Sequence, residues 1–225
     1  MTIYTYSERG IVDSLVYSLK DDELVKKFLI LGFPELKNKN LTDINFYLEH
    51  SLSEFGSPDL IISYKLAGKK TVVFIEAKVS NGKKSWNLAR QYEDYCNDKK
   101  KPKDITSNFF RQIALKKLLI QNKSIVETSG VSNGDNRVMG TKEERKLGEN
   151  EIVLKLFNLI KDADKDEYLG LVPEASIPTF EEKDKVLLSD IKYITWAQIK
   201  DFAIDNKLRY LIDNFEWNKG LIYNE

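Results

Sequence analysis

Residues 57–79 read SPDLIISYKLAGKKTVVFIEAKV, two segments rich in β-branched and aromatic residues on either side of a glycine. Segments 59–67 and 71–79 predict a pair of strands, and Gly68 favours a tight turn between them. The run from 72 to 75 is apolar throughout, which is typical of a strand buried on both faces. We therefore expect a β-hairpin at the centre of the fold.

This hairpin gathers charged residues on one face of the sheet. A two-residue loop at 68–69 would place Asp59 across from Lys78, and a shift by two residues would place it across from Glu76. In both registers the three side chains share a face and lie roughly 5 to 8 Å apart. A slip by one residue would move Asp59 to the opposite face.

The grouped residues have the chemistry of a divalent-metal site. Asp59 and Glu76 supply carboxylates, and the backbone carbonyl of Ala77 is a third oxygen donor of the kind that Mg²⁺ prefers. Lys78 adds an ammonium group, and a bound metal ion would lower the pKa of that group. In the alternative interpretation, Glu76 and Lys78 are only the solvent-exposed end of a strand, and Asp59 is a turn residue after a proline.

Pro58-Asp59 and Glu76-Ala77-Lys78 resemble the two diagnostic motifs of the PD-(D/E)XK nuclease superfamily, the restriction-endonuclease-like fold. The resemblance implies an α/β protein with an αβββαβ core, whose mixed central sheet is flanked by helices. It also implies hydrolysis of nucleic acid with Mg²⁺ as cofactor, for which Mn²⁺ can substitute. Asp59 and Glu76 would be metal ligands, and Lys78 would position or polarise the attacking water.

Composition limits the other classes of function. A chain of 225 residues predicts one domain. The stretch at about 124–150 is rich in glycine and polar residues, and we interpret it as a flexible insertion that forms a loop or hairpin over the site. A single cysteine, Cys96, and a single histidine, His50, leave no intramolecular disulfide and no Cys- or His-rich metal site. We expect a cytoplasmic protein without a membrane-spanning segment or signal peptide.

The charge is unevenly distributed although the net charge is zero. Residues 60–103 contain 11 Lys and Arg against 4 Asp and Glu, a net charge of +7 in the segment that holds the metal motif. Lys83, Lys84 and Arg90 are therefore candidates for contact with nucleic acid. The alternative is a solvated, lysine-rich surface without a partner.

An N-terminal helix from about residue 6 to 20 carries Glu8 on the same side as its apolar stripe. Members of the superfamily often supply a further acid from this helix, which would make Glu8 a catalytic residue and a ligand of a second metal ion. Alternatively, Thr5-x-x-Glu8 is a capping box, in which Glu8 serves the backbone alone.

A helix from about 85 to 97, with Ser85 as its N-cap, carries Gln91 on an otherwise apolar face. Gln91-x-x-x-Tyr95 resembles a motif of RecB-type and phage-exonuclease members, where these residues border the active site and touch substrate. The alternative is that Gln91 only satisfies backbone groups while Tyr95 packs. Cys96, without a nearby histidine, reads as a small apolar residue.

The remaining pattern completes an α/β arrangement. Helices are expected at 24–31, 109–121 and 152–160 and from 195 or 196 to 204; strands are expected at 168–173 and 193–196, with an ambiguous first strand at 48–55. Trp196 and Trp217 are interpreted as packing residues.

The combined expectation is a Mg²⁺-dependent nuclease that acts on DNA in restriction, repair or phage conflict. Cleavage of a duplex would favour a homodimer. The alternative is a non-catalytic nucleic-acid-binding or interaction module that keeps the nuclease fold.

Overall fold

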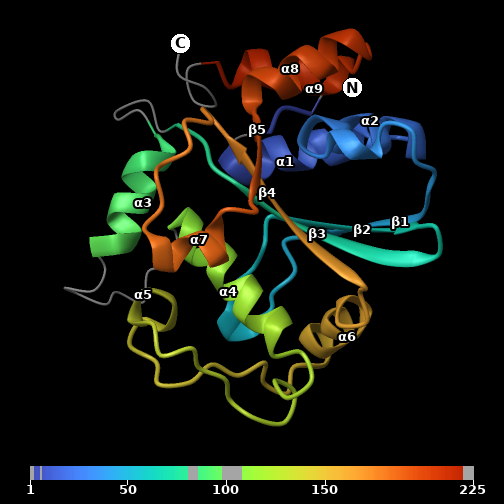
Figure 1. The fold of residues 1–225 in the computed structure, drawn as a ribbon. Helices are drawn as coiled ribbons and strands as arrows, with labels where there is room; N and C mark the ends of the chain where they lie inside the picture. Colours follow the sequence, from blue (N-terminus) through green and yellow to red (C-terminus); the bar gives the residue numbers. More distant parts are fainter. Residues whose placement is uncertain (1–2, 6, 81–85, 98–107, 220–225) are drawn as a thin grey trace.

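The computed structural model describes residues 3–5, 7–80, 86–97 and 108–219, which form a mixed, open β-sheet flanked by helices. Its five strands lie in the order β1-β2-β3-β4-β5 (Figure 1). β1, β2 and β3 pair antiparallel, whereas β3, β4 and β5 pair parallel. Their bounds are β1 (Leu41–Leu48), β2 (Leu60–Leu66), β3 (Lys69–Ala77), β4 (Lys165–Val172) and β5 (Lys192–Thr195).

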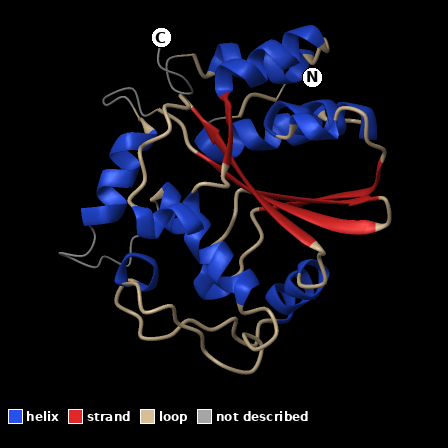
Figure 2. Ribbon diagram, in the orientation of Figure 1, coloured by secondary structure: helices blue, strands red, loops and turns tan. Residues whose placement is uncertain are grey.

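Helices cover both faces of the sheet (Figures 1 and 2). One layer consists of α1 (Ser7–Ser18), α2 (Asp22–Gly32), α8 (Trp196–Asp205) and α9 (Arg209–Trp217). The other contains α3 (Leu88–Asn97), α4 (Phe109–Gln121), α6 (Glu151–Ile160) and α7 (Glu182–Leu188), together with the short α5 (Asn136–Met139). Two 3₁₀ turns, η1 (Pro34–Leu36) and η2 (Ser53–Phe55), flank β1.

Each central strand contributes alternate residues to two separate cores. In β3, Val72 and Phe74 pack with α4, whereas Val73 and Ile75 pack with α1 and α2. These four side chains are at most 1 % exposed. The prediction of a strand buried on both faces is therefore confirmed.

The β2–β3 hairpin adopts the second of the two registers considered from the sequence. Leu66 pairs with Lys69 and Leu60 with Ile75, so the two-residue loop is Ala67-Gly68. The expected loop at 68–69 is wrong by one residue. Both loop residues have positive φ, 51° at Ala67 and 80° at Gly68, as a turn that matches the twist of the strands requires.

The first strand lies earlier in the chain than expected. β1 spans 41–48, and the expected strand at 48–55 is wrong because that segment contains the turn η2. Positive φ values at Glu49 (49°) and Ser53 (54°) interrupt an extended conformation there. The turn still buries Leu52 and Phe55 completely, which explains why its apolar residues resemble a strand in the sequence.

The other expected elements appear with small shifts in their bounds. α4 has the bounds predicted for it, and Leu115, Leu118 and Leu119 are buried as expected. α3 is described from Leu88, and Ser85 lies outside the described residues. α7 and α9 were not anticipated.

Residues 124–150 are mostly irregular but contribute to the core. This segment contains α5 and an isolated bridge between Val131 and Arg145. Val126, Val131, Val138 and Leu147 are at most 4 % exposed and join the cluster around α4. The segment therefore closes the α4 side of the core.

The hairpin loop generates a stability prediction. A Cβ at Gly68 would meet no atom within 4 Å, so Gly68→Ala should act only through backbone strain. It is expected to reduce the free energy of unfolding by about 1–2 kcal/mol, because alanine disfavours positive φ by that amount. Ala67→Asn, which creates the preferred Asn-Gly turn, should instead raise it by about 0.5 kcal/mol. Urea denaturation of both variants measures this, and equal effects of the two would contradict the assigned turn.

Candidate functional site

The two predicted carboxylates meet where β2 begins and β3 ends. Continuing the hairpin register by one residue beyond Leu60 places Asp59 opposite Glu76. Asp59 Oδ2 accepts a hydrogen bond of 2.7 Å from the backbone N–H of Ala77. The side chain of Glu76 is 1 % exposed and lies on the α4 side of the sheet, as the alternation with Phe74 requires. The predicted same-face arrangement is confirmed.

Lys78 joins the carboxylates through its ammonium group. Its Nζ donates to the carbonyl of Ala77 at 2.6 Å, to Glu76 Oε1 at 3.0 Å and to Glu8 Oε1 at 3.2 Å. The side chain is 10 % exposed, so Lys78 is largely enclosed by the protein. The described residues thus contain the expected cluster of two acids and a lysine, with Glu8 as a third acid.

Two backbone hydrogen bonds fix the position of Lys78. Its N–H donates to the carbonyl of Leu171 at 2.8 Å, which extends the parallel pairing of β3 and β4 by one residue. Its carbonyl accepts from Trp196 Nε1 at 2.7 Å, and the Trp196 side chain is fully buried at the start of α8. Trp196 is therefore a packing residue, as predicted, and it also anchors the lysine.

The position of Glu8 favours membership in the cluster over the capping box. α1 begins at Ser7, so Thr5 lies before the N-cap position. The hydroxyl of Thr5 donates to the carbonyl of Gly10 at 2.7 Å. Glu8 therefore accepts a hydrogen bond from Lys78, and this lysine links Glu8 to Glu76.

A second lysine, absent from the sequence-based prediction, contacts the cluster from α4. Lys116 Nζ lies 3.7 Å from Glu76 Oε2, and the side chains of both residues are 1 % exposed. In the sequence, Lys116 stands three residues before the inward-facing Leu119, at the edge of the apolar stripe. Many amphipathic helices carry a lysine at such an edge, so this signal is too common to identify a buried cation.

Burial and crowding of the acids determine the protonation of the cluster. Burial, and then the charge of Glu76, raises the pKa of Asp59 to about 8, and burial also raises the pKa of Glu8. Burial alone would lower the pKa of Lys78, but Glu76, Glu8 and Asp59 outweigh it and raise that pKa. The lowering expected from a bound metal is thus the opposite of what these carboxylates produce by themselves.

The oxygen donors fit a hard divalent cation. Among the described residues, no three or more Asp, Glu, His or Cys side chains converge closely enough to hold a metal ion, so Glu8 is not grouped directly with the other two acids. The donors at hand are the carboxylates of Asp59 and Glu76 and the carbonyl of Ala77. Glu76 Oε2 is buried and has no hydrogen-bond partner within the described part of the chain, so it retains acceptor capacity for a cation.

The structure does not bring Gln91 and Tyr95 to this cluster. Gln91 Oε1 accepts from the N–H of Phe109 at 3.0 Å and thereby satisfies the start of α4, which is the backbone role considered as the alternative. Tyr95 is fully buried, so it is not available to touch substrate in this structure. Arg90 is exposed on α3. Lys83 and Lys84 lie outside the described residues.

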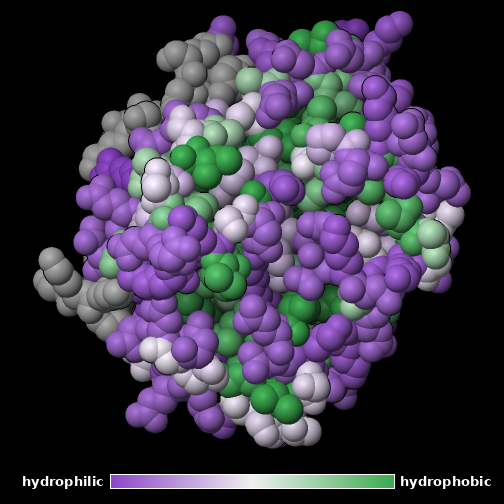
Figure 3. Space-filling view, viewed as in Figure 1, coloured by the Kyte–Doolittle hydropathy of each residue, from purple (hydrophilic) through white to green (hydrophobic). Residues whose placement is uncertain are grey.

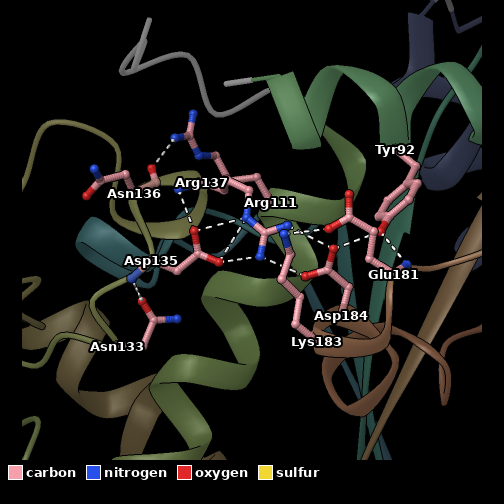
Figure 4. Close-up of polar contacts among 9 residues, drawn as sticks. All are labelled: Tyr92, Arg111, Asn133, Asp135, Asn136, Arg137, Glu181, Lys183 and Asp184. Carbon is pink, nitrogen blue, oxygen red and sulfur yellow. Dashed lines mark hydrogen bonds and ion pairs between the residues drawn. The ribbon is translucent and has the colours of Figure 1, made fainter. Parts of the chain in front are cut away.

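A buried network of Tyr92, Arg137 and Asp184 links α3, α5 and α7 (Figure 4). Tyr95 packs against this network. The guanidinium of Arg137 lies 4.7 Å from the centroid of its ring. Arg137 donates to both oxygens of Asp184, at 2.7 and 2.8 Å, and it also pairs with Asp135. Tyr92 donates its hydroxyl to Asp184 at 2.7 Å. The carboxylate of Asp184 is therefore satisfied by Tyr92 and Arg137, and these contacts tie α3, α5 and α7 together.

Comparison of the chain with protein-family models, with curated proteins and with solved structures gave no match. No helix in the described part of the chain combines the length and apolar character needed to cross a membrane. On the face shown in Figure 3, hydrophobic areas are small and separated by hydrophilic residues. The cluster around Glu76 is therefore the feature from which a function can be inferred.

The raised pKa of Asp59 predicts a pH dependence of stability in metal-free protein. Between its ordinary value of 3.8 and about 8, folded Asp59 keeps a proton that the unfolded chain loses. The folded state binds more protons there, so the contribution of Asp59 to stability is greatest below pH 4 and is lost as the pH rises toward 8. Asp59→Asn should make the decline in stability between pH 5 and pH 8 shallower, measured by urea denaturation in EDTA. An unchanged slope would show that Asp59 is ionised normally.

The Arg137 network predicts a large loss of stability on removal of its central acid. Asp184→Ala leaves a buried guanidinium short of one partner and is expected to cost about 3 kcal/mol. Glu182→Ala on the same helix is the matched control, because Glu182 is 87 % exposed and pairs only with Lys185. That control should cost less than about 1 kcal/mol. Equal losses in chemical denaturation would contradict the structural role given to the network.

Proposed function

We propose that this protein is a Mg²⁺-dependent nuclease of the PD-(D/E)XK type that hydrolyses phosphodiester bonds in DNA. The observation that carries the proposal is the convergence of Asp59, Glu76 and Lys78 at one end of the sheet, with Glu76 almost completely buried. Asp59 and Glu8 are partly buried acids with raised pKa values, and groups shifted in this way cluster at functional sites.

The order of elements supports the same proposal. α1, β1, β2 and β3 precede α3 and α4, and β4 then pairs parallel to β3. This order is compatible with the αβββαβ succession that the motif resemblance implies, with β5 as an additional strand. Pro58-Asp59 immediately precedes β2, and Glu76-Ala77-Lys78 spans the end of β3.

The residues of the cluster divide the chemistry among them. Asp59, Glu76 and the Ala77 carbonyl would hold Mg²⁺, or Mn²⁺ in its place. When bound, the ion would neutralise charge on the phosphate and provide hydroxide at neutral pH. Lys78 keeps a proton on Nζ, because three carboxylates raise its pKa, and can donate a hydrogen bond to the attacking water or to a phosphate oxygen.

The substrate class follows from the charge near the cluster. The segment 60–103 has a net charge of +7. Within it, Arg90 is exposed on α3, the first helix after β3 in the sequence. A polyanion such as DNA suits this charge, and the contact would weaken as salt concentration rises. Cleavage of both strands of a duplex would call for two copies of the site, hence a homodimer.

Incubation of the purified protein with supercoiled and linear DNA in Mg²⁺ or Mn²⁺ tests the proposal. We expect metal-dependent cleavage that EDTA abolishes. Lys78→Ala should reduce the cleavage rate by roughly 100-fold or more, since a positioned proton donor contributes that much. Lys65→Ala is the matched control, because Lys65 lies on β2, is 47 % exposed and pairs with Asp43. It should cleave at the wild-type rate.

Two results would contradict this function. Cleavage by Lys78→Ala at the wild-type rate would remove the lysine from the mechanism. Absence of cleavage by the wild type, together with normal DNA binding, would favour the non-catalytic binding module.

A further inference from the structure

Two oppositely charged atoms face each other inside the protein without a hydrogen bond. Lys116 Nζ and Glu76 Oε2 are both buried, and neither has a hydrogen-bond partner among the described residues. They lie 3.7 Å apart, close enough for an ion pair but too far for a hydrogen bond. Isolated charges in such surroundings are costly, so this pair calls for an explanation beyond stability.

The ammonium of Lys116 is also close to the backbone of Gly56. A Cβ at Gly56 would lie 3.1 Å from Lys116 Nζ, and Gly56 has a φ of 82°. Gly56 lies on the segment that leads to Asp59. The side chain of Lys116 therefore extends from α4 to the end of β3 and to the segment that precedes Asp59.

Glu76 is consequently held by two ammonium groups that differ in burial. Its Oε1 accepts from Lys78, whose side chain is 10 % exposed. Its Oε2 faces Lys116, whose side chain is 1 % exposed. Lys78 is therefore the more accessible of the two lysines, whereas Lys116 is closed off from solvent.

We propose that Lys116 is a positioning residue that holds Glu76 from the core side and weakens the affinity of the cluster for a divalent cation. This inference rests on the proposed function, because it assigns the metal to Glu76 and Asp59. A cation bound by Glu76 lies within a few ångströms of Lys116, and the two positive charges repel each other. The repulsion is only weakly screened, since neither residue is in contact with bulk water.

The sign of the effect follows from comparing the two roles of Lys116. Its removal would loosen one oxygen of Glu76, but the carboxylate stays confined by close packing and by Lys78. Burial lowers the pKa of Lys116, whereas Glu76 and Asp59 oppose this shift and favour the protonated ammonium. Removal of that positive charge from beside a dication is the larger change. Loss of Lys116 is therefore expected to tighten metal binding rather than weaken it.

Mn²⁺ binding to the full-length protein tests this inference. Free Mn²⁺ is measured by electron paramagnetic resonance during titration of the wild type and of Lys116→Met, which removes the charge at similar side-chain length. We expect Lys116→Met to bind Mn²⁺ about tenfold more tightly, or more, on the scale of a buried charge pair. Lys117→Met is the matched control, because Lys117 is also buried on α4 but pairs with Asp190 and lies over the ring of Tyr168. Its affinity should equal that of the wild type.

The results of this titration distinguish a failure of the role proposed for Lys116 from a failure of the proposed nuclease function. Glu76→Gln serves as the reference for binding at the cluster. If the wild type binds Mn²⁺ through Glu76 and Lys116→Met binds equally or more weakly, the role of Lys116 is overturned while the metal site stands. If the wild type shows no binding that depends on Glu76, the proposed function fails and this inference fails with it.

A folding defect is resolved by further variants. If Lys116→Met does not fold, Lys116→Gln replaces it in the titration, because glutamine retains a polar group in the enclosed position. If neither folds, the double variant E76Q/K116M is compared with both by thermal denaturation. Recovery of a cooperative transition supports direct pairing of the two charges. Persistent unfolding shows that Lys116 serves the core independently of Glu76 and overturns the inference.

Discussion

The structure depends on the register of the β2–β3 hairpin. Side chains alternate across a strand, so the pairing of Leu60 with Ile75 determines that Glu76 faces α4 and that Asp59 lies across from it. The two-residue loop Ala67-Gly68 imposes this register from one end, with both residues at positive φ. Burial of both faces of β3 imposes it from the sides, because a slip by one residue would exchange the residues of the two cores.

Burial of Glu76 is better explained by chemistry than by stability. An apolar residue at the end of β3 would pack against α4 without the desolvation penalty of a carboxylate, and such replacements of buried ion pairs are often stabilising. Instead, Lys78 and Lys116 approach the two oxygens of Glu76 from different elements. Burial, and then the charge of Glu76, also raises the pKa of Asp59 to about 8. A cluster with this excess of acceptor oxygen is suited to receive a further cation.

Local patterns predicted those parts of the fold that local physics determines. Apolar periodicity gave α4 its bounds, and the glycine between two β-rich segments located the hairpin. Asp59, Glu76 and Lys78 could be grouped because hairpin neighbours are close in sequence. The contact of Lys116 with Glu76 and the pairing of Arg137 with Asp184 could not be predicted in this way. Each contact joins residues more than 35 positions apart through packing that no local pattern encodes. The strand expected at 48–55 failed because burial of Leu52 and Phe55 by a turn produces the same apolar signature.

The cluster also requires parts of the chain that contribute no charge to it. β3 ends at Ala77, so the backbone of Lys78 lies beyond the hairpin, where β2 provides it with no partner. The carbonyl of Leu171 in β4 and the indole of Trp196 in α8 bind that backbone instead, from more than 90 residues away. An ammonium that must meet three oxygens within about 3 Å tolerates little displacement of its own backbone. The parallel half of the sheet is therefore the element that converts a hairpin with charged ends into a cluster of defined geometry.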